Sequence, residues 1–183
     1  GLNRYYAQGI GLPPETEEGH YDELLKSFAD DAGLSIKEYE KQYYQRKIVN
    51  KELDDYFVHD RSVRESGHDT SYRLEAVCAS LNVVELNTML YKYETDFEEI
   101  IKDYFGGNFI YNGFTYTPEY WKEKSQIRKQ LMNQYLWNEK INCFDDYNIE
   151  SKSSINFLSA TSFFPLWTGI ATKEQAEKMV KEA

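Results

Sequence analysis

The sequence predicts an all-α protein whose helices come in pairs, with an inner helix covered by an outer one. Three observations lead to this fold class. Apolar residues recur at steps of three and four along several segments, which is the period of an α-helix. Serine, threonine and proline open these segments and glycine closes them, so short loops separate neighbouring helices. The strand–helix–strand alternation of a parallel sheet does not occur.

The first helix is expected from about Tyr21 to Ala32, with Gly33 just past its end. The residues before it should form a loop, because "GIGLPPETEEG" combines glycines with two adjacent prolines. A second helix of roughly twenty residues should open at Ser35, which forms a capping box with Glu38. It should then run through "KEYEKQYYQRKIVNKELDDYF".

The next two helices are predicted from apolar faces. One face ends before the pair Gly106-Gly107 and consists of Leu86, Leu90, Tyr93, Phe97, Ile100 and Tyr104. Thr117 and Pro118 then open a further helix, as N-cap and first helical residue. Its apolar positions are Ile127, Leu131 and Tyr135, with Trp121 and Met132 beside them.

Three features are expected in the last part of the chain. The segment "NCFDDYN" should form a turn or short hairpin. The segment "LSATSFFPLWTGI" should form an apolar helix with a kink at Pro165, an end at Gly169, and Trp167 in the core together with Phe163 and Phe164. Thr172 and Gln175 should form the capping box of the last helix.

Composition excludes several classes of function. A formal charge of −10 argues against nucleic acid or an anionic membrane as partner. No apolar run reaches the length of a membrane span. The two cysteines, Cys78 and Cys143, lack metal-ligand spacing, so reduced, packed thiols and a cytoplasmic location are expected. The chain begins without methionine or a signal peptide, which favours a piece of a longer protein or a processed chain.

The stretch 61–75, "RSVRESGHDTSYRLE", allows two interpretations. In the first, Ser66 and Asp69 cap a helix, and the arginines are its surface partners, each contributing little to stability. In the second, Asp69 is a sheltered general acid in a pocket rimmed by guanidinium groups such as that of Arg64, and Gly67 lets a ligand approach the backbone. His68 is an alternative acid or base.

Other assignments are weaker. His59, Asp60, His68 and Asp69 include metal-ligand types, but their spacing matches no metal motif, so no metal site is predicted. Six tyrosines could contact a ligand but are more often packing residues. They are Tyr5, Tyr6, Tyr43, Tyr44, Tyr91 and Tyr93.

Four segments resemble one family of glycoside hydrolases, the trehalases. "RESGHDTSYR" resembles the stretch that carries their catalytic acid, and "NRYYAQGIGLPPETEEGHYDEL" resembles an upstream loop of the fungal neutral (cytosolic) members. "LNTMLYKYETD" and "SATSFFPLWTGIATKEQAEKMV" resemble later parts of the same catalytic domain. The likeness covers nearly the whole chain in order.

The resemblance implies part of an (α/α)6 barrel and the hydrolysis of α,α-trehalose to two glucose molecules with inversion. It implies that Asp69 is the proton donor and that Glu15, Arg64 and Gly67 bind the sugar. Two departures from bacterial members stand out: "PPE" ends at Glu15 where they tend to have Arg-Pro-Glu, and His68 replaces a tryptophan.

The resemblance also implies that residues 1–183 are one partial catalytic domain, incomplete at both ends, whose general base lies outside the chain. The isolated chain should then be nearly inactive. The partners implied are trehalose and the rest of the trehalase chain. No cofactor is expected within these residues; calcium and regulatory partners would act through separate segments. A non-catalytic sugar-binding or scaffold protein of the same α/α fold is the alternative.

Overall fold

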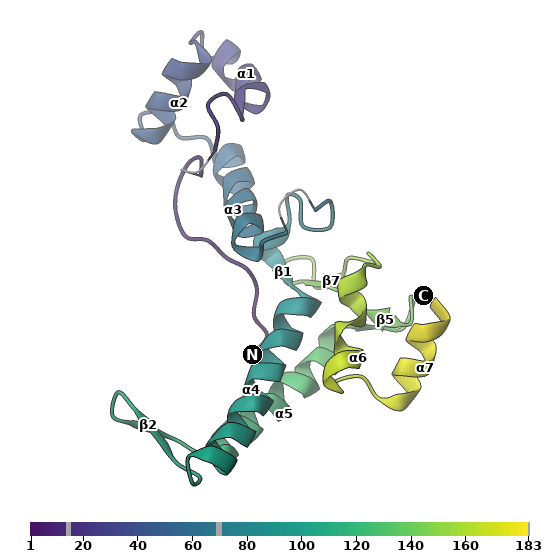
Figure 1. The fold of residues 1–183 in the computed structure, drawn as a ribbon. Coiled ribbons are helices and arrows are strands. Elements are labelled where there is room, and N and C mark those ends of the chain that lie inside the picture. Colours follow the sequence, from purple (N-terminus) through teal and green to yellow (C-terminus); the bar gives the residue numbers. More distant parts are fainter. Residues whose placement is uncertain (14–15, 69–70, 183) are drawn as a thin grey trace. The chain divides into compact units, whose positions relative to one another are not determined.

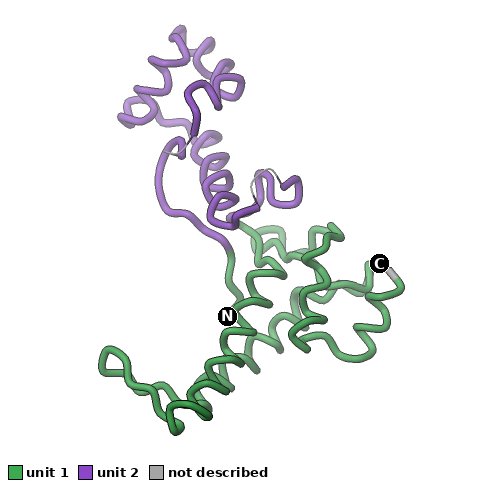
Figure 2. Tube along the Cα trace, viewed as in Figure 1, with its two compact units in different colours: residues 1–4, 80–183 green, residues 5–79 purple. Residues whose placement is uncertain are grey.

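The computed structural model describes residues 1–13, 16–68 and 71–182, and these form two compact units. Unit 2 comprises Tyr5–Ala79, and unit 1 comprises Gly1–Arg4 with Ser80–Ala183 (Figure 2). Helix dominates the described residues, as predicted, and short strands add three small sheets. No helix in this part of the chain is both long and apolar enough to cross a membrane.

Unit 2 contains the helices α1 (Asp22–Asp31), α2 (Ile36–Tyr44) and α3 (Lys51–Ser66) (Figure 1). The first agrees with the prediction, and Gly33 follows it with φ of 65°. The prediction of one long second helix is wrong, because this segment forms two helices, α2 and α3. Asn50 opens α3 by accepting the Leu53 N–H at 3.1 Å, a capping bond that the sequence analysis missed.

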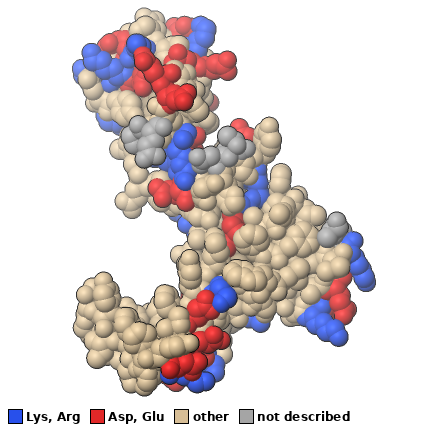
Figure 3. All heavy atoms as spheres, viewed as in Figure 1, with Lys and Arg blue, Asp and Glu red and all other residues tan. Residues whose placement is uncertain are grey.

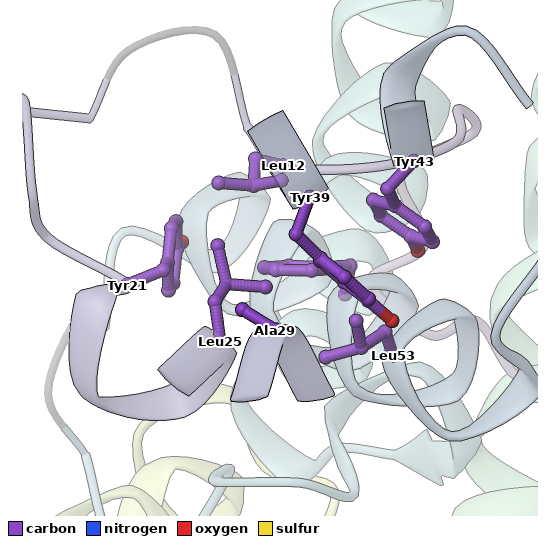
Figure 4. Close-up of a cluster of buried hydrophobic side chains, with 8 residues drawn as sticks. Leu12, Tyr21, Leu25, Ala29, Tyr39, Tyr43 and Leu53 are labelled. Atoms are coloured by element: carbon purple, nitrogen blue, oxygen red, sulfur yellow. The ribbon is translucent and has the colours of Figure 1, made fainter. Parts of the chain in front are cut away.

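The core of unit 2 gathers side chains from its three helices and the preceding loop (Figure 4). The buried cluster consists of Leu12, Tyr21, Leu25, Ala29, Tyr39, Tyr43, Leu53 and Phe57. Two of its tyrosines bury the ring but direct the hydroxyl to a carboxylate. Tyr43 donates to Asp54 at 2.6 Å and Tyr21 donates to Asp60 at 2.6 Å.

Helix α3 also holds the loop that leads towards position 15. The Arg61 guanidinium donates to the carbonyls of Gly9, at 2.6 Å, and Gly11. Ser62 accepts the Ala7 N–H at 3.2 Å. Arg61 is only 9% exposed, and Arg73 is buried too, so these two arginines are not the surface partners of the first interpretation.

Unit 1 is built on α4 (Val84–Tyr104) and α5 (Pro118–Tyr135), which pack along each other. A hairpin of β2 (Phe109–Tyr111) and β3 (Phe114–Tyr116) joins them, and charged side chains are absent from its strands (Figures 1 and 3). Thr117 caps α5 by accepting the Tyr120 N–H at 3.3 Å, which confirms that start. α4 ends at Tyr104, before the glycine pair, also as predicted.

Small antiparallel sheets and short helices complete unit 1. β1 (Leu81–Asn82), β6 (Tyr147–Asn148) and β7 (Ser153–Ser154) form one sheet, and β4 (Trp137–Asn138) pairs with β5 (Cys143–Phe144). The turn or short hairpin expected for "NCFDDYN" is wrong, because the segment contains β5 and β6, which pair with strands of two different sheets. Two 3₁₀ turns, η1 (Cys78–Ser80) and η2 (Ala160–Phe163), also occur. Cys78 and Cys143 are both buried, as predicted.

The apolar faces predicted for α4 and α5 form only part of their contact: the rings of Phe97 and Trp121 lie 4.8 Å apart, but other residues of both faces are exposed. Tyr93 and Tyr104 are 58% and 82% exposed, and Ile127 of α5 is exposed as well. The contact also contains a buried ion pair, in which Arg128 donates to Glu94 at 2.9 Å. A buried ion pair whose hydrogen bonds are satisfied can take the place of apolar contacts, so periodicity identified the helices but only part of the face that they bury.

The apolar segment near the C-terminus is shorter than expected. η2 precedes α6 (Phe164–Thr168), and Pro165 stands in the first turn of α6 instead of kinking a longer helix. Gly169 ends α6 with φ of 73°, as predicted. Trp167 is 64% exposed, so the prediction that it lies in the core is wrong. Phe163 and Phe164 are half-buried. The Thr172–Gln175 capping box opens α7 (Lys173–Glu182) and is confirmed.

The adjacent aspartates 145 and 146 are buried and satisfy backbone groups. Asp146 accepts the Val84 N–H at 2.9 Å, in the first turn of α4, where the N-cap residue Val83 has no side-chain acceptor. Asp145 accepts the Asn156 N–H at 2.7 Å. Asp146 therefore caps α4 from 62 residues further along the chain.

Asp146→Ala is expected to loosen the start of α4. The Val84 N–H would be left buried without its acceptor, at a cost of about 1–3 kcal/mol. Hydrogen exchange of the amides in the first turn of α4 checks this, with Asp146→Asn as the matched control because its amide oxygen can still accept. Equal protection in the alanine variant and the parent would contradict the capping role.

Candidate functional site

A pocket of about 470 Å³ lies in unit 2, beside the last turns of α3. Its wall includes His20, Tyr56, Asp60, Arg64, Tyr72 and Glu75. Aromatic rings and a few polar groups around one cavity are the usual lining of a small-molecule site. The stretch 71–76, which follows position 70 on the chain, forms part of the same wall.

Arg64, predicted to bind the sugar, lies in this wall on the last turn of α3. Its Nε donates to the Asp60 carboxylate at 3.2 Å, one helical turn earlier. Its Nη2 donates to the Tyr21 hydroxyl at 3.1 Å. The side chain is 29% exposed, so it is neither free in solvent nor closed off from a ligand.

Tyr21 completes this group from the residue before α1. Its hydroxyl donates to Asp60 at 2.6 Å while its ring packs against Phe57, with ring centres 5.0 Å apart. Burial of the ring, and then the neighbouring Asp60 carboxylate, raise the pKa of the Tyr21 phenol. Tyr21 therefore stays protonated at neutral pH and keeps its hydrogen bond to Asp60.

Gly67 ends α3 and has φ of 69°, a left-handed conformation that suits glycine. A Cβ at this position would meet no atom within 4 Å among the described residues, so the backbone borders open space. The helix therefore ends at Gly67. Whether a sugar approaches this backbone stays a prediction.

Ser66 lies at the end of a helix, contrary to the interpretation in which it opens one. Its hydroxyl donates to the Val63 carbonyl and accepts the His68 N–H at 3.0 Å. The chain therefore leaves α3 here, and Ser66 serves the C-terminal turn. Asp69 and Glu15, the predicted proton donor and the other predicted sugar contact, lie outside the described residues, so their roles stay predictions.

Sequence reasoning missed most of the pocket wall. Asp60 was weighed only as a metal ligand, although its spacing of four from Arg64 on a helix could have revealed the pair. Tyr21 gave no such signal, because it lies 39 residues from Asp60. None of the six tyrosines weighed for ligand contact lines this pocket, and Tyr43 is fully buried.

The described residues contain no cluster of three or more potential metal ligands among His, Cys, Asp and Glu. His59, one of the weighed ligand types, uses its Nδ1 to accept the Ala79 N–H at 3.1 Å. This bond gives His59 a structural role in unit 2.

A partly aromatic pocket with polar groups on a helical scaffold is thus the candidate small-molecule site. The chain belongs to the trehalase family, whose family model matches residues 1–183. It is 44% identical to the cytosolic neutral trehalases of Kluyveromyces lactis and Saccharomyces cerevisiae, over its full length in both cases. These alignments cover 24% and 25% of the two relatives, so the chain spans about a quarter of their length.

A solved structure of the neutral trehalase from Saccharomyces cerevisiae gives the same result in three dimensions. It matches with a TM-score of 0.94 at 44% identity. The match covers 100% of this chain and 34% of that chain. Similarity of sequence and backbone therefore runs along the whole chain, including the segments on both sides of positions 15 and 69.

Proposed function

We propose that the full-length protein containing these residues is a cytosolic trehalase that hydrolyses α,α-trehalose to two glucose molecules with inversion. The observation that carries this proposal is the 44% identity to cytosolic neutral trehalases along the whole chain. Substrate and location in those relatives follow from their names; for this protein both are part of the proposal. No cofactor is proposed within these residues.

In this proposal Asp69 protonates the glycosidic oxygen as the bond breaks. A second carboxylate, outside this chain, activates water on the opposite face of the sugar, at roughly 6.5–9.5 Å from the acid. Glu65, four residues before Asp69, is not that base: it lies exposed on α3, and we assign it no chemical role.

Arg64, Gly67 and Glu15 hold the sugar in the same proposal. The guanidinium of Arg64 in the pocket wall supports its part, because a fixed donor suits a sugar hydroxyl. The pocket also presents the rings of Tyr56 and Tyr72, whose faces can pack against the C–H face of a sugar.

We also infer that residues 1–183 form one partial catalytic domain within an (α/α)6 barrel, with the rest of the trehalase chain as their partner. The exposed apolar positions of α4 and α5 support this inference, because rows of such residues on a helix usually face another element. Regulatory partners, if the protein has them, belong to segments outside these residues.

The decisive assay follows glucose release from trehalose by NMR in the first minutes, before the anomers equilibrate. Inversion releases one β-glucose and one α-glucose from each α,α-linked molecule, whereas retention releases α-glucose only. Trehalose binding without glucose release would favour the non-catalytic alternative. In the same assay, the isolated 183-residue chain is expected to be nearly inactive, since it lacks the proposed base.

A further inference from the structure

Two tyrosine–aspartate–arginine groups are built around aspartates of α3, and only one of them reaches the pocket. In the first, Tyr21 donates to Asp60, and Arg64 donates to both Asp60 and the Tyr21 hydroxyl. Asp60 and Arg64 line the pocket. The aspartate thus lies beside an arginine in the pocket wall.

The second group consists of Tyr43, Asp54 and Arg46. Tyr43 donates to Asp54 at 2.6 Å, the same distance as in the first group. Arg46, however, donates to Asp54 with both Nη1 and Nη2, at 2.9 and 3.3 Å. None of these three residues lines the pocket. This group therefore has the same chemistry as the first but does not contact a ligand in the pocket.

The two arginines differ in which nitrogen atoms they use. Arg64 donates through Nε and Nη2, and within the described residues its Nη1 has no hydrogen-bond partner. Two bonds to different atoms fix the plane of a guanidinium group. The remaining nitrogen then has a set direction before any ligand arrives, which lowers the entropy lost on binding.

We propose that Asp60, assisted by Tyr21, is a positioning residue that holds Arg64 so that its Nη1 meets a hydroxyl group of the sugar. This inference rests on the proposed function, because it requires trehalose in the pocket. The role proposed for Asp60 is exerted through Arg64, to which it is hydrogen-bonded. The negative charge of Asp60 also offsets the positive charge of Arg64, which suits an uncharged ligand such as a sugar.

The test measures kcat and KM for trehalose in the full-length protein and its variants. Asp60→Asn keeps the size of the side chain but removes its charge, and it should lower kcat/KM about tenfold, mainly by raising KM. Tyr21→Phe removes the hydroxyl and its bonds to Asp60 and Arg64 but leaves the ion pair between them, so it should have a smaller effect in the same direction. In an Arg64→Gln background, Asp60→Asn should cause no further loss, because there is no guanidinium left to position.

Asp54→Asn is the matched control, since it breaks the equivalent group away from the pocket. It should lower the melting temperature while leaving kcat/KM unchanged. The inference is overturned if Asp60→Asn matches the parent, if Asp54→Asn causes the same loss, or if Asp60→Asn lowers kcat/KM equally without Arg64. Should Asp60→Asn fail to fold, Tyr21→Phe decides by the same comparisons.

Failure of this inference is distinct from failure of the proposed function. A parent that hydrolyses trehalose, with Asp60 variants that do so equally well, overturns the positioning role alone. A full-length parent that releases no glucose from trehalose overturns the proposed function, and this inference with it.

Discussion

Asp69→Asn in the full-length protein is expected to lower kcat for trehalose by about a hundred- to ten-thousand-fold, the usual contribution of a general acid. The amide cannot donate a proton of comparable acidity to the leaving oxygen, so glucose would depart as an unprotonated alkoxide. Because the two side chains have the same shape, binding of trehalose should change little. Initial rates of glucose release measure the effect, and circular dichroism checks the fold.

The leaving group provides a sharper criterion. α-D-Glucosyl fluoride loses fluoride with little need for protonation, so Asp69→Asn should lose much less activity on it than on trehalose. Glu65→Gln is the matched control, the same kind of change four residues earlier at an exposed position of α3. Full trehalose turnover by Asp69→Asn, or an equal loss with both substrates, would exclude Asp69 as proton donor.

Glu94→Gln should cause the largest loss of stability, about 3–5 kcal/mol, because it leaves the buried Arg128 guanidinium without a counter-charge. Arg128 donates to Glu94 through Nε and Nη2, and its Nη1 donates to Asn87 at 2.8 Å and Asn3 at 3.0 Å. The same arginine therefore ties the first residues of the chain to α4 and α5.

Hydrogen exchange of the α4 and α5 amides measures this local stability within a large protein. Glu174→Gln is the matched control, because it makes the same change in an exposed ion pair with Lys178 of the same unit. It should leave exchange in α4 and α5 unchanged. Equal exchange in Glu94→Gln and the parent would show that the buried pair does not hold the two helices together.

About half of the candidate site could be predicted. The resemblance singled out Arg64 and Gly67, and the structure places Arg64 in a pocket wall and Gly67 beside open space at the end of α3. It also assigned roles to Asp69 and Glu15, which lie outside the described residues. Tyr21 and its bond to Asp60 could not be predicted, because a contact across 39 residues leaves no local pattern.

The sequence by itself determined the helical class, the family and several helix ends. Thr117, Thr172 and Gly169 act as predicted because a cap or terminator bonds groups within three or four residues of itself. Such bonds depend only on local spacing. Their energies hardly change with what packs against the helix, so they can be inferred without knowing the fold.

Only the tertiary structure decided which faces are buried and what holds Arg64. Periodicity placed an apolar face on α4, but the helix packs through Glu94, whose partner Arg128 lies 34 residues away. Arg61 likewise is buried, because its guanidinium donates hydrogen bonds to the loop carbonyls of Gly9 and Gly11. A charged side chain can be buried only where distant groups satisfy it, and the fold alone brings those groups together.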